Sequence, residues 1–472
     1  MEFGFKNSDP TEKEGSSRRE ASTTAFSPFA QEHLLPSGEV LYQTRPPLLN
    51  EALLGVRDAV FDLILTQMDL VKAAKMPRAE LRKAIERLFL HYADEHKVQA
   101  NLREQQTIVD DIVDDMVGLG PIEHLMHDPS VSDILVNGPR HVYVERKGKL
   151  YLTDVRFRDD RHVVQVAQRI ASRVGRRVDE SSPMVDARLS DGSRVNVVIP
   201  PLAVNGPSLC IRRFSPINIS LEEMVAMGTM DAPLQKFLEL ASNGRLNILV
   251  TGGTGAGKTT LLNALSKKID PRERIITIED AVELRLEQPN LVRLESRPSN
   301  LEGAGQVAIR DLVRNALRMR PDRIIIGEVR GPEAFDMLQA MNTGHDGSIS
   351  TLHANNAPEA ISRLINMVMM AAEQLPVHVI RAFIADAVDL IVHVARLRDG
   401  SRKVLRVLEV VGATDHEVIT QDLFSYQISG VDGEGRLEGH YAVRPCSEEM
   451  RGKLKFQGIY DDVMACFGGQ HD

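Results

Sequence analysis

Residues 247–266 read NILVTGGTGAGKTTLLNALS, and this stretch decides the fold of the region around it. Residues 247–251 have the composition of a buried strand, and residues 260–269 have that of a helix. Between them, Gly252–Thr259 matches the pattern G-x-x-x-x-G-K-[ST] in full. Glycines let such a loop curl around phosphates, while backbone N–H groups and the helix start face the anion. The stretch therefore predicts a phosphate-binding loop between a strand and a helix.

The side chains of this loop have expected roles toward a bound nucleotide. Lys258 can neutralise charge on the β- and γ-phosphates, and Thr259 can ligate Mg²⁺. ATP and Mg²⁺ are therefore the ligands that the loop predicts. The expected nucleotide contacts are Gly253, Thr254, Gly255, Ala256, Gly257, Lys258, Thr259 and Thr260.

Two apolar runs further along the chain end in acids. The run RIII leads through Gly327 to Glu328, and the run RIITI leads to Glu279 and Asp280. Ligands of open α/β sheets bind at the carboxyl ends of the strands, so these acids are expected beside the loop. Glu328 is expected to activate the attacking water, and both Glu279 and Glu328 to support Mg²⁺ through water. Gly327 stands where an aspartate is usual, which weakens direct carboxylate ligation, and Asp280 can equally cap the next segment.

Two histidines flank another short apolar run. His345 and His353 lie on either side of SISTL. The residues alone leave three roles open: structural hydrogen bonds, sensing of the γ-phosphate, or a bridge to a neighbouring subunit. A metal site is disfavoured, because no cysteine or third histidine joins them nearby.

Arginines supply the remaining candidates. A cation that reaches the developing γ-phosphate charge raises the rate by about 10³–10⁵-fold, and arginine suits this because its charge is permanent. Arg194, Arg212 and Arg213 are the candidates, and they would have to reach the nucleotide from a different domain. Their alternative role is that of surface strand arginines. A further set on one helix face is expected to be a solvated or subunit-facing stripe: Arg310, Arg314 and Arg318.

The domain organisation follows from changes of pattern along the 472 residues. Residues 1–48 are rich in Ser, Thr and charge and predict a disordered tail, and residues 49–118 predict a three-helix bundle. Residues 119–215 predict an α+β domain with antiparallel hairpins. Residues 216–232 predict a linker that contains a short helix of its own and can act as a hinge. Alternating strands and helices from 233 to 472 predict an α/β domain with a mostly parallel sheet.

Composition excludes several classes of protein. A net charge of −9 and the low aromatic content of 4% argue against a nucleic-acid binder. Three widely spaced cysteines argue against a disulfide framework, and no apolar run is long enough for a transmembrane helix. The start MEFGFKNSDP has no apolar core of a secretory signal, so the cytoplasm is the expected compartment.

Taken together, the motifs resemble the type II/type IV secretion ATPase superfamily. IEDAVELRL resembles its Asp box, RPDRIIIGEVRGPEA its Walker B segment, and GHDGSISTLHANNAPEA its His box. The segments VGLGPIEHL, DARLSDGSRVNVVIPP, SLCIRRF and MNTGHDGSISTLHAN look most like the Tad (Flp) pilus assembly ATPase of the CpaF type. The resemblance runs from about residue 119 to about 412, and the bundle adds to it.

This resemblance implies a RecA-like ATPase fold and a cytoplasmic homo-hexameric motor. The motor would drive assembly, and by the same logic retraction, of a pilus through inner-membrane platform proteins, to which it would be peripheral. The nucleotide would lie between the N-terminal and ATPase domains. The resemblance assigns the Asp-box role to Glu279, the catalytic glutamate role to Glu328 and the His-box role to His345 and His353. The arginines named above would match the family's N-terminal arginines.

Three other functions remain open at this stage. A type IV secretion ATPase that moves protein or DNA across the envelope shares nearly all the motifs. A nucleic-acid motor would need a basic channel, against which the net charge argues. A scaffold that binds ATP without turnover would not need Glu279, Glu328 and the arginines together.

Overall fold

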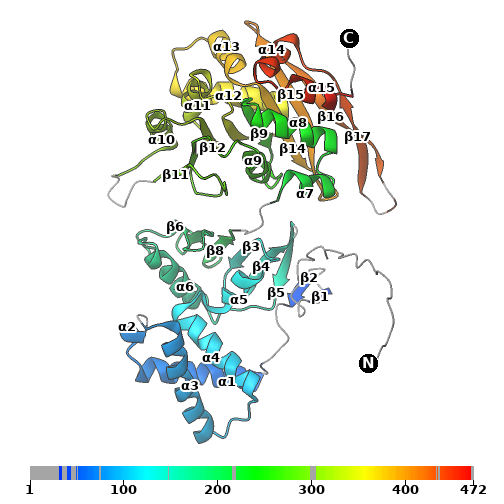
Figure 1. Ribbon diagram of the computed structural model, residues 1–472. Helices are drawn as coiled ribbons and strands as arrows, with labels where there is room; N and C mark the ends of the chain where they lie inside the picture. Colours follow the sequence, from blue (N-terminus) through cyan, green and yellow to red (C-terminus); the bar gives the residue numbers. More distant parts are fainter. Residues whose placement is uncertain are drawn as a thin grey trace, which may run out of the picture. The chain divides into compact units, whose positions relative to one another are not determined.

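A computed structural model of the chain describes residues 31–34, 40–43, 49, 51–73, 76–146, 148–214, 219–297, 305–431, 433 and 436–468. The chain divides into two compact units, Met1–Arg213 and Phe214–Asp472 (Figure 1). Each unit has hydrophobic cores of its own. The prediction of a disordered tail falls mostly on residues outside this description.

A bundle of helices forms one part of the first unit. Over the described residues they are α1 (Glu51–Gln67), α2 (Leu70–Ala73), α3 (Arg78–Glu95) and α4 (Leu102–Val117). The structure thus adds the four-residue α2 to the three predicted helices. Their apolar faces meet in one core, in which Ile64, Leu81, Ile85 and Ile112 are buried. Leu81 and Ile85 lie four residues apart in α3, which is the helical spacing that the periodicity of the sequence predicts.

An eight-stranded sheet, counted over the described residues, forms the rest of the first unit, in the order β1-β2-β5-β4-β3-β8-β7-β6. The strands are β1 (Gln31–Leu34), β2 (Val40–Gln43), β3 (Asp133–Asn137), β4 (His141–Arg146), β5 (Lys149–Thr153), β6 (Met184–Arg188), β7 (Arg194–Val198) and β8 (Ser208–Arg212). The helical elements are η1 (Gly120–Ile122), α5 (Glu123–His127) and α6 (Asp160–Arg173). Alternating residues of the strands pack with α6 to form the core.

The structure differs from the predicted tail at β1 and β2. Strand β2 pairs in parallel with β5 and extends the sheet. Tyr42 is fully buried there, its hydroxyl donates to Asp128 Oδ2 at 3.1 Å, and the Arg146 guanidinium lies over its ring. One aromatic side chain with a satisfied hydroxyl can dock a short strand. The average composition of residues 1–48 does not reveal a contact that depends on the single residue Tyr42.

The second unit is built on a nine-stranded sheet, counted over the described residues, in the order β11-β10-β12-β13-β9-β14-β15-β16-β17. The strands are β9 (Ile248–Gly252), β10 (Ile275–Glu279), β11 (Leu291–Glu295), β12 (Arg323–Val329), β13 (Ile349–His353), β14 (Leu390–Arg396), β15 (Arg402–Ala413), β16 (Val418–Val431) and β17 (Leu437–Val443). The pairs from β11 to β14 are parallel, and those from β14 to β17 are antiparallel. The structure therefore has a mixed sheet, parallel from the edge strand β11 to β14 and antiparallel from there to β17.

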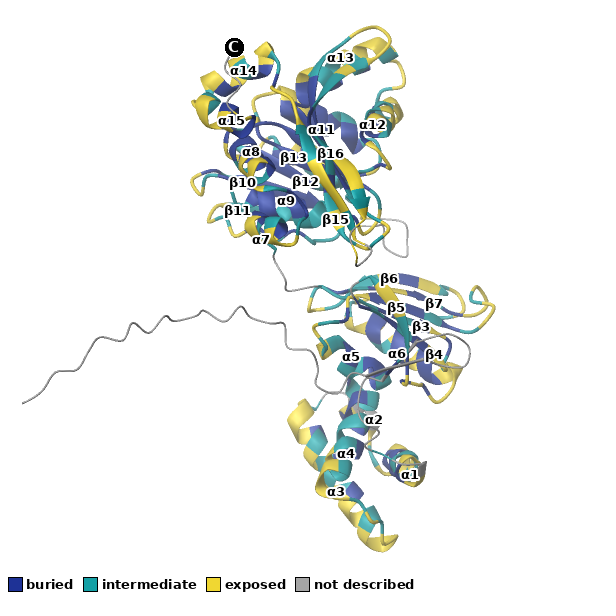
Figure 2. Cartoon of the chain, turned by 90° about the vertical axis from the view of Figure 1, so that its right-hand side faces the viewer, coloured by how far each residue is buried: buried dark blue, intermediate teal, exposed yellow. Residues whose placement is uncertain are grey.

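Helices cover both faces of this sheet. On one face lie α7 (Leu221–Ala226), α8 (Ala232–Asn243), α9 (Lys258–Ser266), α14 (Glu448–Phe456) and α15 (Tyr460–Cys466). On the other lie α10 (Ile309–Ala316), α11 (Glu333–Asn342), α12 (Ala357–Ala371) and α13 (Val377–Ala387). Figure 2 shows the central strands buried between the two layers, which explains their continuous apolar runs. Among the residues that the structure describes, no helix is long and apolar enough to cross a membrane.

Within the predicted linker at 216–232 the structure has a short helix, as the sequence predicts. Residues 215–218 lie outside the description, but α7 begins at a capping box formed by Ser220 and Glu223. Leu221, Met224 and Met230 are buried in the core of the second unit. These apolar side chains bury surface that a free linker would leave in water. Residues 219–232 are therefore packed as part of the second unit.

The amino edge of the parallel strands is closed by a buried ion pair. Arg323, which has no exposed surface, donates through Nε to Glu273 Oε2 at 2.6 Å and through Nη2 to Oε1 at 3.0 Å. Its Nη1 donates to the carbonyls of Ser242 and Gly347. The carboxyl edge of the sheet, by contrast, carries the loop after β9.

Candidate nucleotide-binding site

The glycine loop that the sequence predicts to bind phosphate joins β9 to α9. Gly255 has a φ of +70° and Gly257 a φ of +101°, both in the left-handed region that favours glycine. Gly257 immediately precedes the first residue of α9. Ala256, which lies between the two glycines, is buried. These conformations curl the backbone around the start of the helix, where N–H groups are free to face an anion.

Lys258 lies folded against this loop. Its Nζ donates to the carbonyls of Gly252 and Gly253, at 3.1 Å each. Burial lowers the pKa of Lys258, while the nearby Glu328 carboxylate works in the opposite direction. Thr259 and Thr260 follow in the first turn of α9 and are half-buried. The cation and both hydroxyls therefore sit at the positive end of the helix.

The strand order gathers the other predicted residues at the same edge. In the register of the parallel pairs, His353 at the end of β13 lies opposite Gly252 at the end of β9. Ile278 of β10 lies opposite Ile326 of β12, so Glu279 and Glu328 follow on neighbouring strands. The structure thus brings both acids and one histidine to the edge that carries the loop.

The two histidines are separated by the strand between them. His353 Nε2 lies 3.0 Å from Thr254 Oγ1, so this histidine contacts the loop. His345 precedes β13 at the amino edge of the sheet. The length of this five-residue strand separates it from His353 by about 15 Å. His345 Nδ1 lies 3.2 Å from the carbonyl oxygen of Ala340. The structure does not bring His345 to the phosphate loop of its own chain, because the residues before and after a strand lie at opposite edges of the sheet.

Glu279 is buried at the end of β10. Its Oε2 accepts from the backbone N–H groups of Glu283 and Leu284, at 2.7 and 2.8 Å. Its Oε1 is buried and has no hydrogen-bond partner in the structure. Burial raises the pKa of Glu279 to about 7, although the two backbone donors oppose the shift. The carboxyl group can therefore hold or release a proton near neutral pH.

Glu328 is held by an arginine that the sequence analysis did not single out. Arg330 donates to Glu328 Oε2 through Nε at 3.0 Å and Nη2 at 2.5 Å. Arg330 Nη1 also lies 3.7 Å from Asp280 Oδ2, while Asp280 Oδ1 accepts from Ser296. Arg330 therefore links the acids that end β10 and β12. Its position two residues after Glu328 is the only signal of this in the sequence.

The three N-terminal arginines lie in the first unit and differ from one another. Arg194 of β7 and Arg212 of β8 face each other across neighbouring strands. Arg212 is more than half exposed, with Nε 3.5 Å from Asp133 Oδ1. Arg213 instead donates to the carbonyls of Asp128 and Val131, and burial lowers its pKa. Arg213 is thus occupied within its own unit, whereas Arg212 keeps an exposed guanidinium.

The arginines predicted to form a solvated or subunit-facing stripe are only partly so: Arg314 is more than half exposed, whereas Arg310 is largely covered. Arg310 Nε and Arg314 Nε donate to the two carboxylate oxygens of Asp336 in α11, at 2.7 and 2.8 Å. The Asp336 side chain is 3% exposed, so the pairs join α10 to α11. Arg318 is exposed. Helical spacing places these arginines on one face, but it cannot tell whether a partner helix covers that face.

Two further residues contact the loop or its strand without a signal in the sequence. His393 of β14 is buried, with Nδ1 3.0 Å from Thr251 Oγ1, and burial lowers its pKa. Arg402, the first residue of β15, donates through Nε to the Gly255 carbonyl at 3.1 Å. Both follow from the pairing of β14 with β9, which lie far apart in the sequence.

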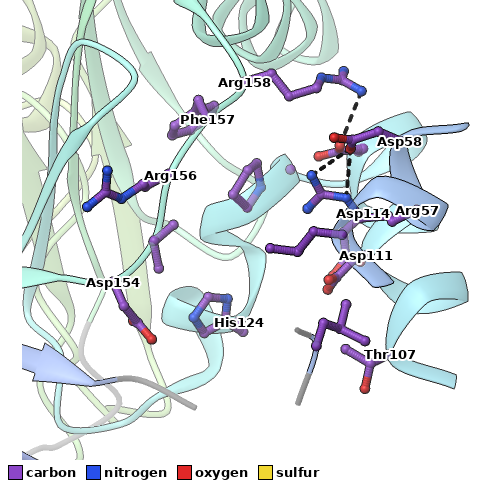
Figure 3. Close-up of a pocket in the computed structure, with 16 residues that line it drawn as sticks. Arg57, Asp58, Thr107, Asp111, Asp114, His124, Asp154, Arg156, Phe157 and Arg158 are labelled. Atoms are coloured by element: carbon purple, nitrogen blue, oxygen red, sulfur yellow. Dashed lines mark hydrogen bonds and ion pairs between the residues drawn. The ribbon is translucent and has the colours of Figure 1, made fainter. Parts of the chain in front are cut away.

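A cavity of about 420 Å³ lies elsewhere, in the first unit (Figure 3). Its lining includes Arg57 and Asp58 of α1, Asp111 of α4, and Arg156 and Arg158 before α6. None of the predicted site residues lines it. Opposite charges along its wall already neutralise one another, as between Arg57 and Asp58 at 2.7 Å. The cavity therefore has no part in the phosphate site.

The fold and the loop define an α/β protein whose sheet edge carries a glycine loop of the predicted phosphate-binding pattern. Residues 115–449 match the model of the family described as Type II/IV secretion system protein. A candidate conjugal transfer protein of Mycobacterium tuberculosis is 40% identical over 317 residues, which cover 66% of this chain and 88% of that protein. The type IV secretion system protein PtlH of Bordetella pertussis is 36% identical over 305 residues, covering 59% and 89%.

Among solved structures, the chain is similar to the VirB11 ATPase of the Brucella suis type IV secretion system, determined in complex with sulphate. The identity is 31%, the coverage 61% of this chain and 95% of that chain, and the TM-score 0.34. The family model matches more than half of the sequence, so this chain belongs to the Type II/IV secretion system protein family.

Proposed function

We propose that the protein is an ATP hydrolase with a RecA-like fold in its second unit. The single observation that carries this proposal is the meeting of three features at one sheet edge: the glycine loop with Lys258, the buried Glu279 and the half-buried Glu328. A loop alone binds phosphate. Acids beside it can also orient and deprotonate water, which hydrolysis requires.

The residues at this edge fit a nucleotide-bound Mg²⁺. Such an ion usually takes one or two protein ligands and completes its shell with phosphate oxygens and water. Thr259 supplies a hydroxyl at the start of α9, and Glu279 keeps a buried oxygen without a partner. We propose Thr259 as the direct ligand, with Glu279 and Glu328 acting through water. The ion would stabilise charge on the transferred phosphoryl group.

Within this proposal the chain's own residues divide the work. Lys258 exchanges its bonds to the Gly252 and Gly253 carbonyls for phosphate oxygens. Glu328 accepts the proton of the attacking water, which requires that it share or leave its contacts with Arg330. His353 holds the loop through Thr254.

The test is ATP turnover and nucleotide binding by the purified full chain. Lys258→Ala is expected to abolish nucleotide binding. Glu328→Gln is expected to bind ATP with unchanged affinity and to lose about 10²–10⁴-fold in kcat, the usual contribution of a general base. Lys236→Ala, a charge removal on the exposed face of α8, is the matched control and should behave as wild type. Wild-type turnover by Glu328→Gln would exclude Glu328 as the base, and binding without turnover by wild type would indicate a nucleotide-gated scaffold.

The work that the hydrolysis drives is a second level of the proposal. We infer a homo-hexameric ring in the cytoplasm that acts on inner-membrane platform proteins to assemble a Tad-type pilus. Support comes from the family and from the segments that resemble the CpaF type. Light scattering of the purified chain with a non-hydrolysable ATP analogue tests the ring. A monomer under all nucleotide conditions would contradict it.

Transport by a type IV secretion system is the second candidate, and the relatives favour it. The similar proteins include one named for conjugal transfer in Rhizobium radiobacter and the PtlH protein named for type IV secretion. Deletion of the gene separates the two functions. Loss of surface pili with normal transfer of DNA and protein supports the pilus motor, and the reverse result supports the transport ATPase.

The contribution of the first unit's arginines stays a prediction. Because Arg213 is engaged by backbone carbonyls, Arg194 and Arg212 are the better candidates for phosphate. Arg212→Ala is expected to lower kcat, whereas Arg213→Ala is expected to lower thermal stability. Unchanged hydrolysis in Arg194→Ala and Arg212→Ala together would exclude these arginines from the reaction.

A further inference from the structure

The turn between β14 and β15 places an arginine against the phosphate loop. Arg402 Nε donates to the Gly255 carbonyl at 3.1 Å. Its Cδ lies 3.4 Å from the position that a Cβ on Gly257 would take. The arginine stem thus runs along the loop from Gly257 to Gly255, where both glycines have positive φ. This contact joins the curled backbone that would hold the phosphates to a strand on its other side.

The turn that carries Arg402 is tightly fixed. Leu397 N donates to the Ser401 carbonyl at 2.8 Å, and Gly400 N donates to the Leu397 carbonyl at 2.9 Å. Asp399 accepts from the backbone and hydroxyl of Ser401, and its other oxygen accepts from Leu437 N in β17. These donors hold the pKa of Asp399 at about 2. The acid nearest in sequence is therefore committed to the turn.

The positive charge of Arg402 is left without a matching carboxylate. Arg402 is exposed, and it makes no ion pair with any residue in the described parts of the chain. Lys258 approaches the same loop from inside, through the carbonyls of Gly252 and Gly253. The loop therefore lies between Lys258 and Arg402. Lys258 is held by two carbonyls, whereas the Arg402 guanidinium uses one of its donors on the loop. Guanidinium groups pair with phosphate through several parallel hydrogen bonds.

We propose that Arg402 is a nucleotide-binding residue of this site, which contacts the phosphate chain from the β14–β15 side. The proposal rests on the proposed function, since it concerns the same nucleotide. Arg402 binds the ground state through charge and does not act on the attacking water, which lies near Glu328. Its removal should therefore weaken binding of ADP and ATP and raise KM, while kcat changes little.

Calorimetric titration with ADP and steady-state kinetics with ATP test this on the full chain. Arg402→Gln should weaken ADP binding and raise KM by about tenfold, as expected for a lost charged hydrogen bond. Arg402→Lys keeps the charge and should recover part of the affinity. Arg398→Gln, which removes an exposed arginine of the same turn, should leave affinity unchanged. The melting temperature without nucleotide should be the same in wild type and the three variants.

Equal ADP affinity in wild type and Arg402→Gln would overturn the proposal, and so would a fall in kcat with KM unchanged. If Arg402→Gln melts early, the comparison of Arg402→Lys with Arg402→Gln decides, because a charge-independent packing role predicts the same loss of affinity in both variants. Failure of wild type to bind ADP at all would instead refute the proposed function. The two failures are therefore distinguishable.

Discussion

Glu279 fills the space in which any side chain on Gly327 would stand. A Cβ on Gly327 would lie 2.9 Å from Glu279 Cγ and 3.5 Å from Oε2, and the first distance is shorter than real Cβ contacts allow. The register explains this, since Ile278 and Ile326 are paired and the next residues of β10 and β12 lie side by side. The glycine before Glu328, where an aspartate is usual, is therefore required by the buried glutamate next to it.

Gly327→Ala is the direct test of this packing. We expect the free energy of unfolding to fall by about 1–3 kcal/mol, because a methyl group is forced into filled space. The backbone of Gly327 does not lie in the left-handed region, so the cost is steric alone. In a Glu279→Ala background the same change should cost almost nothing. Urea unfolding of the four proteins measures this, and an equal cost in both backgrounds would contradict the contact.

The buried Glu279 carboxyl also predicts a pH dependence of stability. Its pKa of about 7 lies above the ordinary value of 4.5, so the folded protein binds a proton more tightly than the unfolded chain. The ionised carboxylate therefore destabilises the fold above pH 7, and this penalty disappears as the pH falls from 7 toward 4.5. Glu279→Gln should be more stable than wild type by roughly 3 kcal/mol at pH 8–9. Unfolding curves from pH 5 to pH 9 test this, and a constant difference would show that Glu279 does not titrate in this range.

The contact between His353 and Thr254 predicts coupling between the loop and β13. One hydrogen bond contributes about 1 kcal/mol, or about fivefold in a rate. His353→Ala and Thr254→Val should each lower kcat/KM for ATP by about fivefold, and the double variant should lose no more than either alone. If the double variant instead lost about 25-fold in kcat/KM, the product of the two single losses, the two side chains would act independently.

The ion pair of Arg323 and Glu273 predicts a large effect on stability far from the site. Arg323→Ala leaves buried carbonyls without their donor and leaves the Glu273 carboxylate with its longer ion pair to Arg245, at 3.5 Å. We expect a loss of about 3–5 kcal/mol in the free energy of unfolding. Arg272→Ala, at an exposed arginine beside Asp270, is the matched control and should change stability little. Similar effects of the two changes would show that the buried pair does not fix the amino edge of the sheet.

The phosphate loop, its strand and its helix could be predicted from the sequence because each depends on residues that are close neighbours in the chain. Glycines at fixed spacing set the loop conformation, and the apolar run before them sets the strand. The acids at the ends of β10 and β12 could be predicted for the same reason, since parallel strands share a carboxyl edge.

Only the tertiary structure decided which side chains meet at that edge. Strand order and register place His353 beside the loop and His345 at the other edge, and the pairing of β14 with β9 brings Arg402 to Gly255. The carbonyls that engage Arg213 likewise belong to a distant loop. Such contacts depend on how separate segments pack, and the local pattern around each residue carries no record of its partner across the sheet.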